Sequence, residues 1–205
     1  MARSIRARVL RQMHQWHWIS SALCLIGMIL FAATGITLNH AAQIPATPVV
    51  TRLQGTLPPG LLAELQTVAA GPDAGALPAA LATWLDAQWS LHPGGRVAEW
   101  SEDEIYLSLP RPGADGWLSV DLLSGDVEVE VIDRGWIAYL NDLHKGRHAG
   151  VVWTWFIDLF AIACLVFCVT GLILLKLHAA HRAMTWPMVT LGLVVPVVLL
   201  ALFVH

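Results

Sequence analysis

The chain has 205 residues, of which 56% are hydrophobic and only 13% are charged, with three cysteines and a formal net charge of −3. This composition excludes a secreted disulfide scaffold, a nucleic-acid binder and a disordered chain. The hydrophobic residues concentrate in three runs, at 18–38, 149–175 and 184–204. Because about 20 apolar residues span a bilayer, each run is predicted to be a transmembrane helix.

The first run resembles a signal peptide in one respect, because four arginines precede it: Arg3, Arg6, Arg8 and Arg11. However, the run is 21 residues long, which exceeds the apolar core of a signal peptide, and residues 38–40 make a poor cleavage site. We therefore expect a retained membrane anchor.

The segment between the first two runs, residues 42–143, is predicted to be a small α+β domain. Residues 45–59 are expected to form a linker, and residues 78–91 a helix, because their apolar side chains recur at helical spacing. Strands are expected at 96–100, 105–109, 117–122 and 127–132. Gly125 lies in the turn before the last strand, at a position expected to need a positive φ. The alternation of valine and glutamate along 127–131 predicts one buried and one acidic, solvated face.

Charge predicts the orientation of the chain in the membrane. Fourteen of the 15 acidic residues lie within 42–143, whereas arginines precede the first run and Lys176 and Arg182 lie between the second and third. Basic flanks are typical of the cytoplasmic side. The expected order is a cytoplasmic N-terminus with the first helix at 1–41 and an external domain at 42–143. The second helix with a cytoplasmic loop follows at 144–183, and the third helix at 184–205.

Histidines mark all four ends of the first two runs: His14, His17, His40, His144, His148, His178 and His181. The predicted topology gathers them into an outer cluster and an inner cluster on opposite membrane faces. Neutral imidazoles on rigid helix ends are ligands for haem or a transition metal. The alternative is that they are interfacial residues that bind nothing. The cysteines are not placed to complete a zinc or copper site, whereas glycines beside aromatic residues suit a flat porphyrin. These glycines are Gly35, Gly150 and Gly171.

Three further features leave alternatives open. At 100° per residue, His14 is about 80° around the first helix from His40 and His17 about 140°, which favours His14 as the inner ligand. Asp158, the one charged residue within the second run, is either a hydrogen-bond acceptor or proton relay beside a ligand, or a protonated structural residue. The acidic residues near position 100 either attract Fe(III) or form a solvated loop, which we favour: Glu99, Glu102, Asp103 and Glu104.

An internal repeat links the first two helices. Residues 31–38 match residues 167–174 through a shared pattern, Phe-x-x-Thr-Gly, followed by aliphatic positions. Glycine in a membrane helix lets a second backbone or a flat ligand approach closely. A match over eight positions also arises by chance, so two interpretations stay open: a functional repeat and a chance similarity.

Three segments resemble the PepSY-associated transmembrane family: residues 13–18 (MHQWHW), residues 34–40 (TGITLNH), and residues 143–150 (LHKGRHAG) followed by Trp155 and Asp158. Gln15 stands where that family has arginine, and larger relatives have more helices. The domain at 42–143 is similar to a PepSY module.

The resemblance implies a bacterial inner-membrane protein with residues 42–143 in the periplasm. It also implies a haem b-containing reductase of Fe(III) or ferric siderophores, fed by an electron donor that the sequence does not identify. One or two haems are expected, with His40 and His144 as the leading outer ligands and His14 and His178 inside. Because three helices enclose a porphyrin only partly, we also expect a homodimer. The competing hypothesis is a membrane-anchored PepSY module that binds ligands or inhibits peptidases without redox activity.

Overall fold

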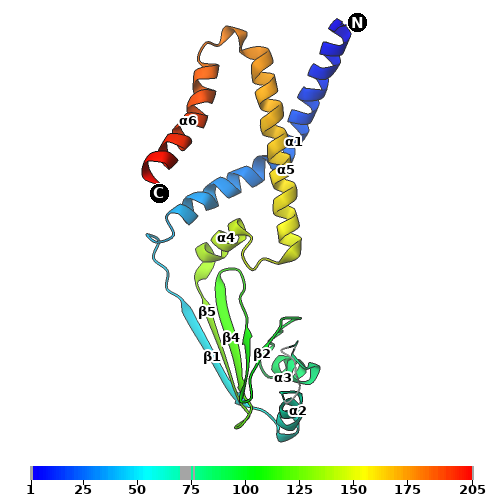
Figure 1. The fold of residues 1–205 in the computed structure, drawn as a ribbon, viewed down its shortest axis with the longest axis vertical. Coiled ribbons are helices and arrows are strands. Elements are labelled where there is room, and N and C mark those ends of the chain that lie inside the picture. Colours follow the sequence, from blue (N-terminus) through cyan, green and yellow to red (C-terminus); the bar gives the residue numbers. More distant parts are fainter. Residues whose placement is uncertain (1, 70–74, 76, 205) are drawn as a thin grey trace. The chain divides into compact units, whose positions relative to one another are not determined.

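The computed structural model describes residues 2–69, 75 and 77–204 and contains three helices long and apolar enough to span a membrane. They are α1 (Ala2–Asn39), α5 (Gly150–His178) and α6 (Thr185–Phe203), and a short 3₁₀ turn, η1 (Ala179–His181), precedes α6 (Figure 1). Their apolar windows carry mean hydropathies of 2.2, 2.6 and 2.3. The three predicted transmembrane helices are therefore confirmed.

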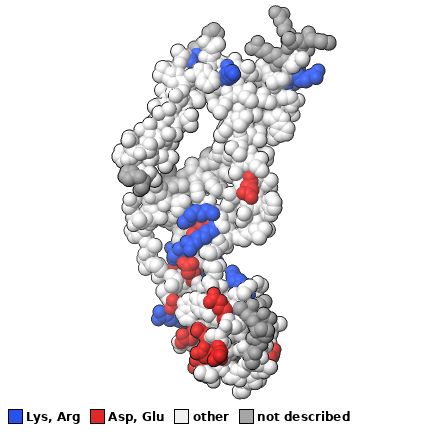
Figure 2. Space-filling view, viewed as in Figure 1, with Lys and Arg blue, Asp and Glu red and all other residues white. Residues whose placement is uncertain are grey.

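A five-stranded antiparallel sheet and three helices lie between α1 and α5. The strands are β1 (Val49–Thr56), β2 (Glu99–Trp100), β3 (Glu104–Ser108), β4 (Ala114–Asp121) and β5 (Asp126–Asp133), and their spatial order is β1-β5-β4-β3-β2. The helices are α2 (Pro59–Ala69), α3 (Ala79–Trp89) and α4 (Gly135–Lys145). Acidic side chains gather on this α+β region (Figure 2), whereas the long helices carry one acidic residue, Asp158. The predicted α+β domain between the first two membrane helices is confirmed.

The core of the α+β domain forms where α2 and α3 cover one face of the sheet. Leu65 of α2 and Leu81 and Leu85 of α3 are fully buried in one cluster with strand residues. The strand members include Ile105, Leu107, Leu118, Val120, Val127 and Val129. Burying one such side chain contributes about 1.5–3 kcal/mol, so this layer is the main source of the domain's stability.

The turn between β4 and β5 has the predicted geometry. Gly125 adopts a φ of +81°, in the left-handed region that glycine tolerates. The Asp121 carboxylate accepts hydrogen bonds from the backbone N–H groups of Ser124 and Leu123, which lowers the pKa of Asp121. Along β5, Val127 and Val129 are buried while the intervening glutamates are not, as the alternation predicted.

The prediction of a linker at 45–59 was wrong, because β1 occupies most of it and pairs along its whole length with β5. As an edge strand, β1 is mostly exposed: Leu53 packs against the core, but the strand has no continuous hydrophobic alternation. Its polar side chains bond to β5 instead, as in the 2.6 Å contact between Arg52 Nε and Glu130 Oε2. The helix expected at 78–91 and the four expected strands are confirmed, whereas α2 and α4 were not predicted.

The structure divides into two compact units. One contains Met1–Leu30 with Trp155–His205, and the other contains Phe31–Thr154. Helices α1 and α5 each contribute to both units.

Gly113 places α4 against the turn before β4. A Cβ at this position would lie 2.7 Å from Tyr139 Cα of α4, and the glycine has a φ of +71°. Gly113→Ala is expected to push α4 off the sheet and to lower the midpoint of chemical unfolding. Gly135→Ala is the matched control, since Gly135 has a φ of +85° but open space around it, so alanine there costs only backbone strain, about 1 kcal/mol. Equal effects of the two substitutions would contradict the packing role of Gly113.

Candidate functional site

The first candidate site holds the ring of His144, in the last turn of α4, against α1. His144 Nδ1 lies 2.7 Å from Thr34 Oγ1, and its ring lies 4.9 Å, centroid to centroid, from the ring of Phe31. The ring also lies over Gly35, where a Cβ would be in van der Waals contact with His144 Cε1 at 3.6 Å. Phe31, Thr34 and Gly35 share one helix face through their i, i+3 and i+4 spacing. These three residues and His144 are the His144 site.

Buried polar contacts of Asn141 and Asp142, which precede His144 on α4, fix the helix in place. Thr37 Oγ1 donates to Asn141 Oδ1 at 2.9 Å, one turn along α1 from Thr34. Asp142 is 3% exposed, and its Oδ2 accepts from Arg134 Nη2 at 2.8 Å and from the N–H of Gly113 at 2.9 Å. These contacts join α4 to α1 and to the sheet, so His144 occupies a defined position.

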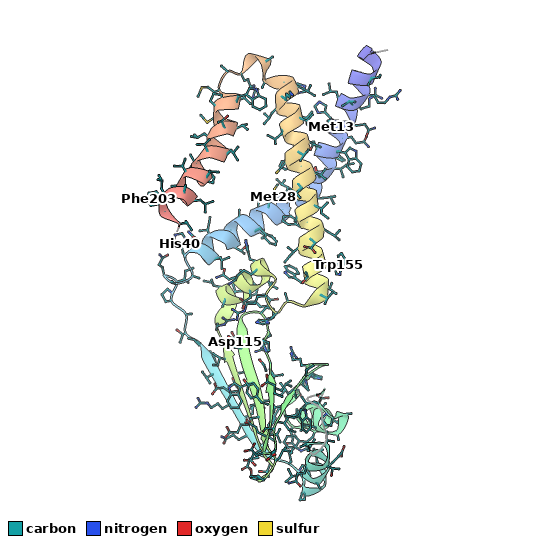
Figure 3. All side chains as sticks on the ribbon, viewed as in Figure 1. Met13, Met28, His40, Asp115, Trp155 and Phe203 are labelled. Carbon is teal, nitrogen blue, oxygen red and sulfur yellow. The ribbon has the colours of Figure 1, made fainter. Side chains whose placement is uncertain are left out.

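Three further contacts complete this arrangement. Arg134 Nε lies 3.5 Å from Asp115 Oδ2, a charge contact that lacks hydrogen-bond geometry, and Asp115 lies near the end of β4 that faces α4 (Figure 3). Gly146, with a φ of +67°, ends α4 two residues after His144 and donates its N–H to Leu143 O. The chain then turns, and Trp153 Nε1 bonds back to Leu143 O at 2.8 Å.

The second candidate site repeats this pattern, with the Phe-x-x-Thr-Gly segment on α5 and the histidine on α1. His17 Nδ1 of α1 lies 3.0 Å from Thr170 Oγ1 and 3.2 Å from Phe167 O of α5. The His17 and Phe167 rings stack with centroids 4.6 Å apart and an interplanar angle of 14°. A Cβ at Gly171 would lie 3.2 Å from His17 Cε1. Phe167, Thr170, Gly171 and His17 are the His17 site.

A groove of about 710 Å³ adjoins the His17 site. Its walls are mainly aliphatic and aromatic, and both His17 and His178 line it. Gly171 and His178 are seven residues apart, so they share a face of α5. Arg182, exposed just beyond η1, also lines the groove. An apolar groove with two imidazoles and one guanidinium suits a flat, apolar ligand that carries a carboxylate.

The other predicted ligands are exposed and less closely held. The ring of His14 makes an edge contact with the ring of His178, with centroids 5.6 Å apart. His178 Nδ1 donates to Leu174 O at 2.9 Å, and His40 Nδ1 donates to Ile36 O at 2.9 Å. His40 lies at the C-terminal end of α1 (Figure 3). It follows Gly35 by five residues, about 140° around the helix, so these two residues lie on different faces.

Two predicted residues lie apart from both sites. His148 has a φ of +56° between α4 and α5, and its Nε2 accepts from Arg147 Nε at 3.1 Å. Asp158 is exposed on α5, and no described residue forms a hydrogen bond or ion pair with it. The side chain of His181 lies outside the described part of the chain. Among the described residues, no three His, Cys, Asp or Glu side chains are grouped to hold a metal ion.

Sequence analysis did not predict that Thr34 and Thr170 contact the two histidines. The only signal was the repeated Phe-x-x-Thr-Gly pattern, which was read as a place for close approach. The structure shows what approaches: in each copy, the side chain that lies over the glycine is an imidazole.

The comparisons with known proteins agree with the topology. No curated protein and no solved structure matches the chain. A family model described as "Putative PepSY_TM-like" matches residues 8–205, nearly the whole chain and both histidine sites. The protein is therefore a membrane protein that belongs to the PepSY_TM-like family.

Proposed function

We propose that this protein is a bacterial inner-membrane b-type haem protein that carries electrons outward to reduce Fe(III), free or bound to a siderophore. The observation that carries the proposal is the pair of histidine sites. In the described structure, His17 and His144 form side-chain hydrogen bonds only through Nδ1. A histidine held in this way can offer its other nitrogen to iron.

The residues around the His17 site fit a haem. The groove supplies apolar walls for a porphyrin, and His17 and His178 supply imidazoles on its lining. Arg182 would bind a haem carboxylate, since a guanidinium is well suited to pair with carboxylates. At the other site, His144 is the outer ligand, and His40 remains the predicted second outer ligand. We therefore propose one haem at each site.

Haem bound at these sites would supply one-electron chemistry between Fe(III) and Fe(II). The chain's own residues hold the ligand rings and keep water away from them. The ring of Phe167 stacks on the imidazole of His17, and the ring of Phe31 lies tilted against that of His144. The threonines and the glycines fix the height and rotation of each ring. No nucleophile or general base is needed for electron transfer.

The direction of transfer follows from the charge distribution. The arginines in the N-terminal part of α1, Lys176 in the last turn of α5 and Arg182 after it favour a cytoplasmic location for the His17 site. The α+β domain and the His144 site are then periplasmic, where ferric substrate arrives. The electron donor, cytoplasmic or in the membrane, acts at the His17 site. Helix α6 has no buried residue, and we propose that a second copy and lipid cover the membrane helices in a homodimer.

A reduced-minus-oxidised spectrum of the purified full-length protein tests this proposal. We expect a Soret band, the α-band of b-type haem, about two haems per chain, and oxidation of the reduced protein by a ferric chelate. Reconstitution with haem before measurement excludes loss during purification. A protein without a Soret band after reconstitution would instead support the membrane-anchored binding module.

A further inference from the structure

The repeated Phe-x-x-Thr-Gly segments hold their histidines through the same three contacts. In each site, the threonine hydroxyl meets Nδ1, the phenylalanine ring lies against the imidazole, and Cε1 lies over the glycine. The histidines come from different elements, α1 in one case and α4 in the other. The repeat is therefore a repeated imidazole-binding arrangement.

The hydroxyl hydrogens decide which partner donates. Thr170 Oγ1 donates to Val166 O at 2.6 Å and to Phe167 O at 3.0 Å, so its hydrogen is directed at the backbone of α5. Its oxygen can then only accept from His17. Phe167 O, the second neighbour of His17 Nδ1, is also an acceptor. His17 must therefore carry its hydrogen on Nδ1.

The His144 site follows the same logic. Thr34 Oγ1 donates to Phe31 O at 3.2 Å, the same i−3 bond that Thr170 makes to Phe167. By analogy with Thr170, we assign the 2.7 Å contact so that the oxygen of Thr34 accepts from His144 Nδ1. In both sites the lone pair of the neutral imidazole is consequently on Nε2.

We propose that Thr34 and Thr170 are paired positioning residues that hold His144 and His17 in the Nδ1–H tautomer and so present Nε2 to iron. The claim that the bound group is haem rests on the proposed function, whereas the assignment of the Nδ1–H tautomer does not. Each threonine also accepts from the ligand ring, which makes the imidazole more basic. A more basic ligand favours Fe(III), so the two threonines lower the reduction potentials of their haems.

The test compares Thr34→Val and Thr170→Val with Thr34→Ser and Thr170→Ser in the full-length protein. Valine keeps the shape and removes the acceptor, whereas serine restores the hydroxyl. In haem-free protein, ¹⁵N NMR of the histidine rings should show the Nδ1–H tautomer in wild type and serine variants. Thr34→Val should show a mixture of tautomers at His144 alone. Thr170→Val should show a smaller change, at His17 alone, because Phe167 O still accepts from His17 Nδ1.

With haem bound, each valine variant should raise the midpoint potential of one haem and weaken its binding about 10- to 100-fold, with serine restoring both. Unchanged tautomers and unchanged potentials in both valine variants would overturn the positioning role while leaving the haem proposal intact. Nδ1–H tautomers in a protein that binds no haem would refute the proposed function while leaving the tautomer assignment intact. A change that serine fails to rescue would show a packing effect and would also overturn the proposal.

Discussion

His17→Ala and His144→Ala are each expected to halve the haem content of the purified protein, and the double variant is expected to lose the Soret band. Each ring is the closely held imidazole of its site, so alanine removes an axial ligand and opens the site to water. Haem per chain, measured after size-exclusion chromatography, gives the result directly. Electron transfer to a ferric chelate should fall at least tenfold, roughly the loss that follows weakened ligand support.

His92→Ala is the matched control for these substitutions. His92 is an exposed histidine of the α+β domain, and its Nε2 lies 3.2 Å from Asp86 Oδ1, away from both sites. It should keep wild-type haem content. If His14→Ala removes the inner haem and His17→Ala does not, the ligand favoured by helical rotation is correct and the His17 site has another role. Full haem content in both His17→Ala and His144→Ala would refute the assignment.

The membrane helices were predictable because each depends on a long, continuous signal. Some 20 apolar residues without charge have few alternative structures, and the three runs correspond to α1, α5 and α6. The α3 helix and strands β2 to β5 also follow from local periodicity. Elements that bury few apolar side chains were missed. Strand β1 is an exposed edge strand, and the buried residues of α4 are the polar Asn141 and Asp142.

The histidine contacts could be predicted only in part. Sequence analysis found histidines at the helix ends and found the repeat, but it did not connect the two. Helical rotation compares positions on one helix, whereas the partner of His17 lies 153 residues away on α5. Which residues meet across two helices depends on their crossing and on side-chain fit, which spacing within α1 does not encode. In the structure, the close approach of the His17 ring to Gly171 shows which residues of the two helices meet.

Asp142 offers the strongest test of how the α+β domain supports the outer histidine. Its side chain is 4% exposed and pairs at 2.8 Å with Arg134, whose side chain is 30% exposed. Asp142→Ala leaves this largely buried guanidinium with only its 3.5 Å contact to Asp115 and removes the acceptor of the Gly113 N–H. Removing one partner of a buried ion pair lowers the free energy of unfolding by about 3 kcal/mol. Chemical unfolding of the full chain in detergent, followed by tryptophan fluorescence, should show this loss.

The same substitution should act on one haem and not on the other. Asp142 precedes His144 by two residues on α4, so loss of its contacts lets α4 shift and loosens the His144 site. The His17 site lies in the other unit and shares no residue with α4. We therefore expect weaker binding of the outer haem, by about tenfold or more, and unchanged inner haem. Asp86→Ala, at an exposed acid of α3, is the control. If Asp142→Ala destabilises the domain but leaves both haems bound as in wild type, α4 does not position the outer ligand.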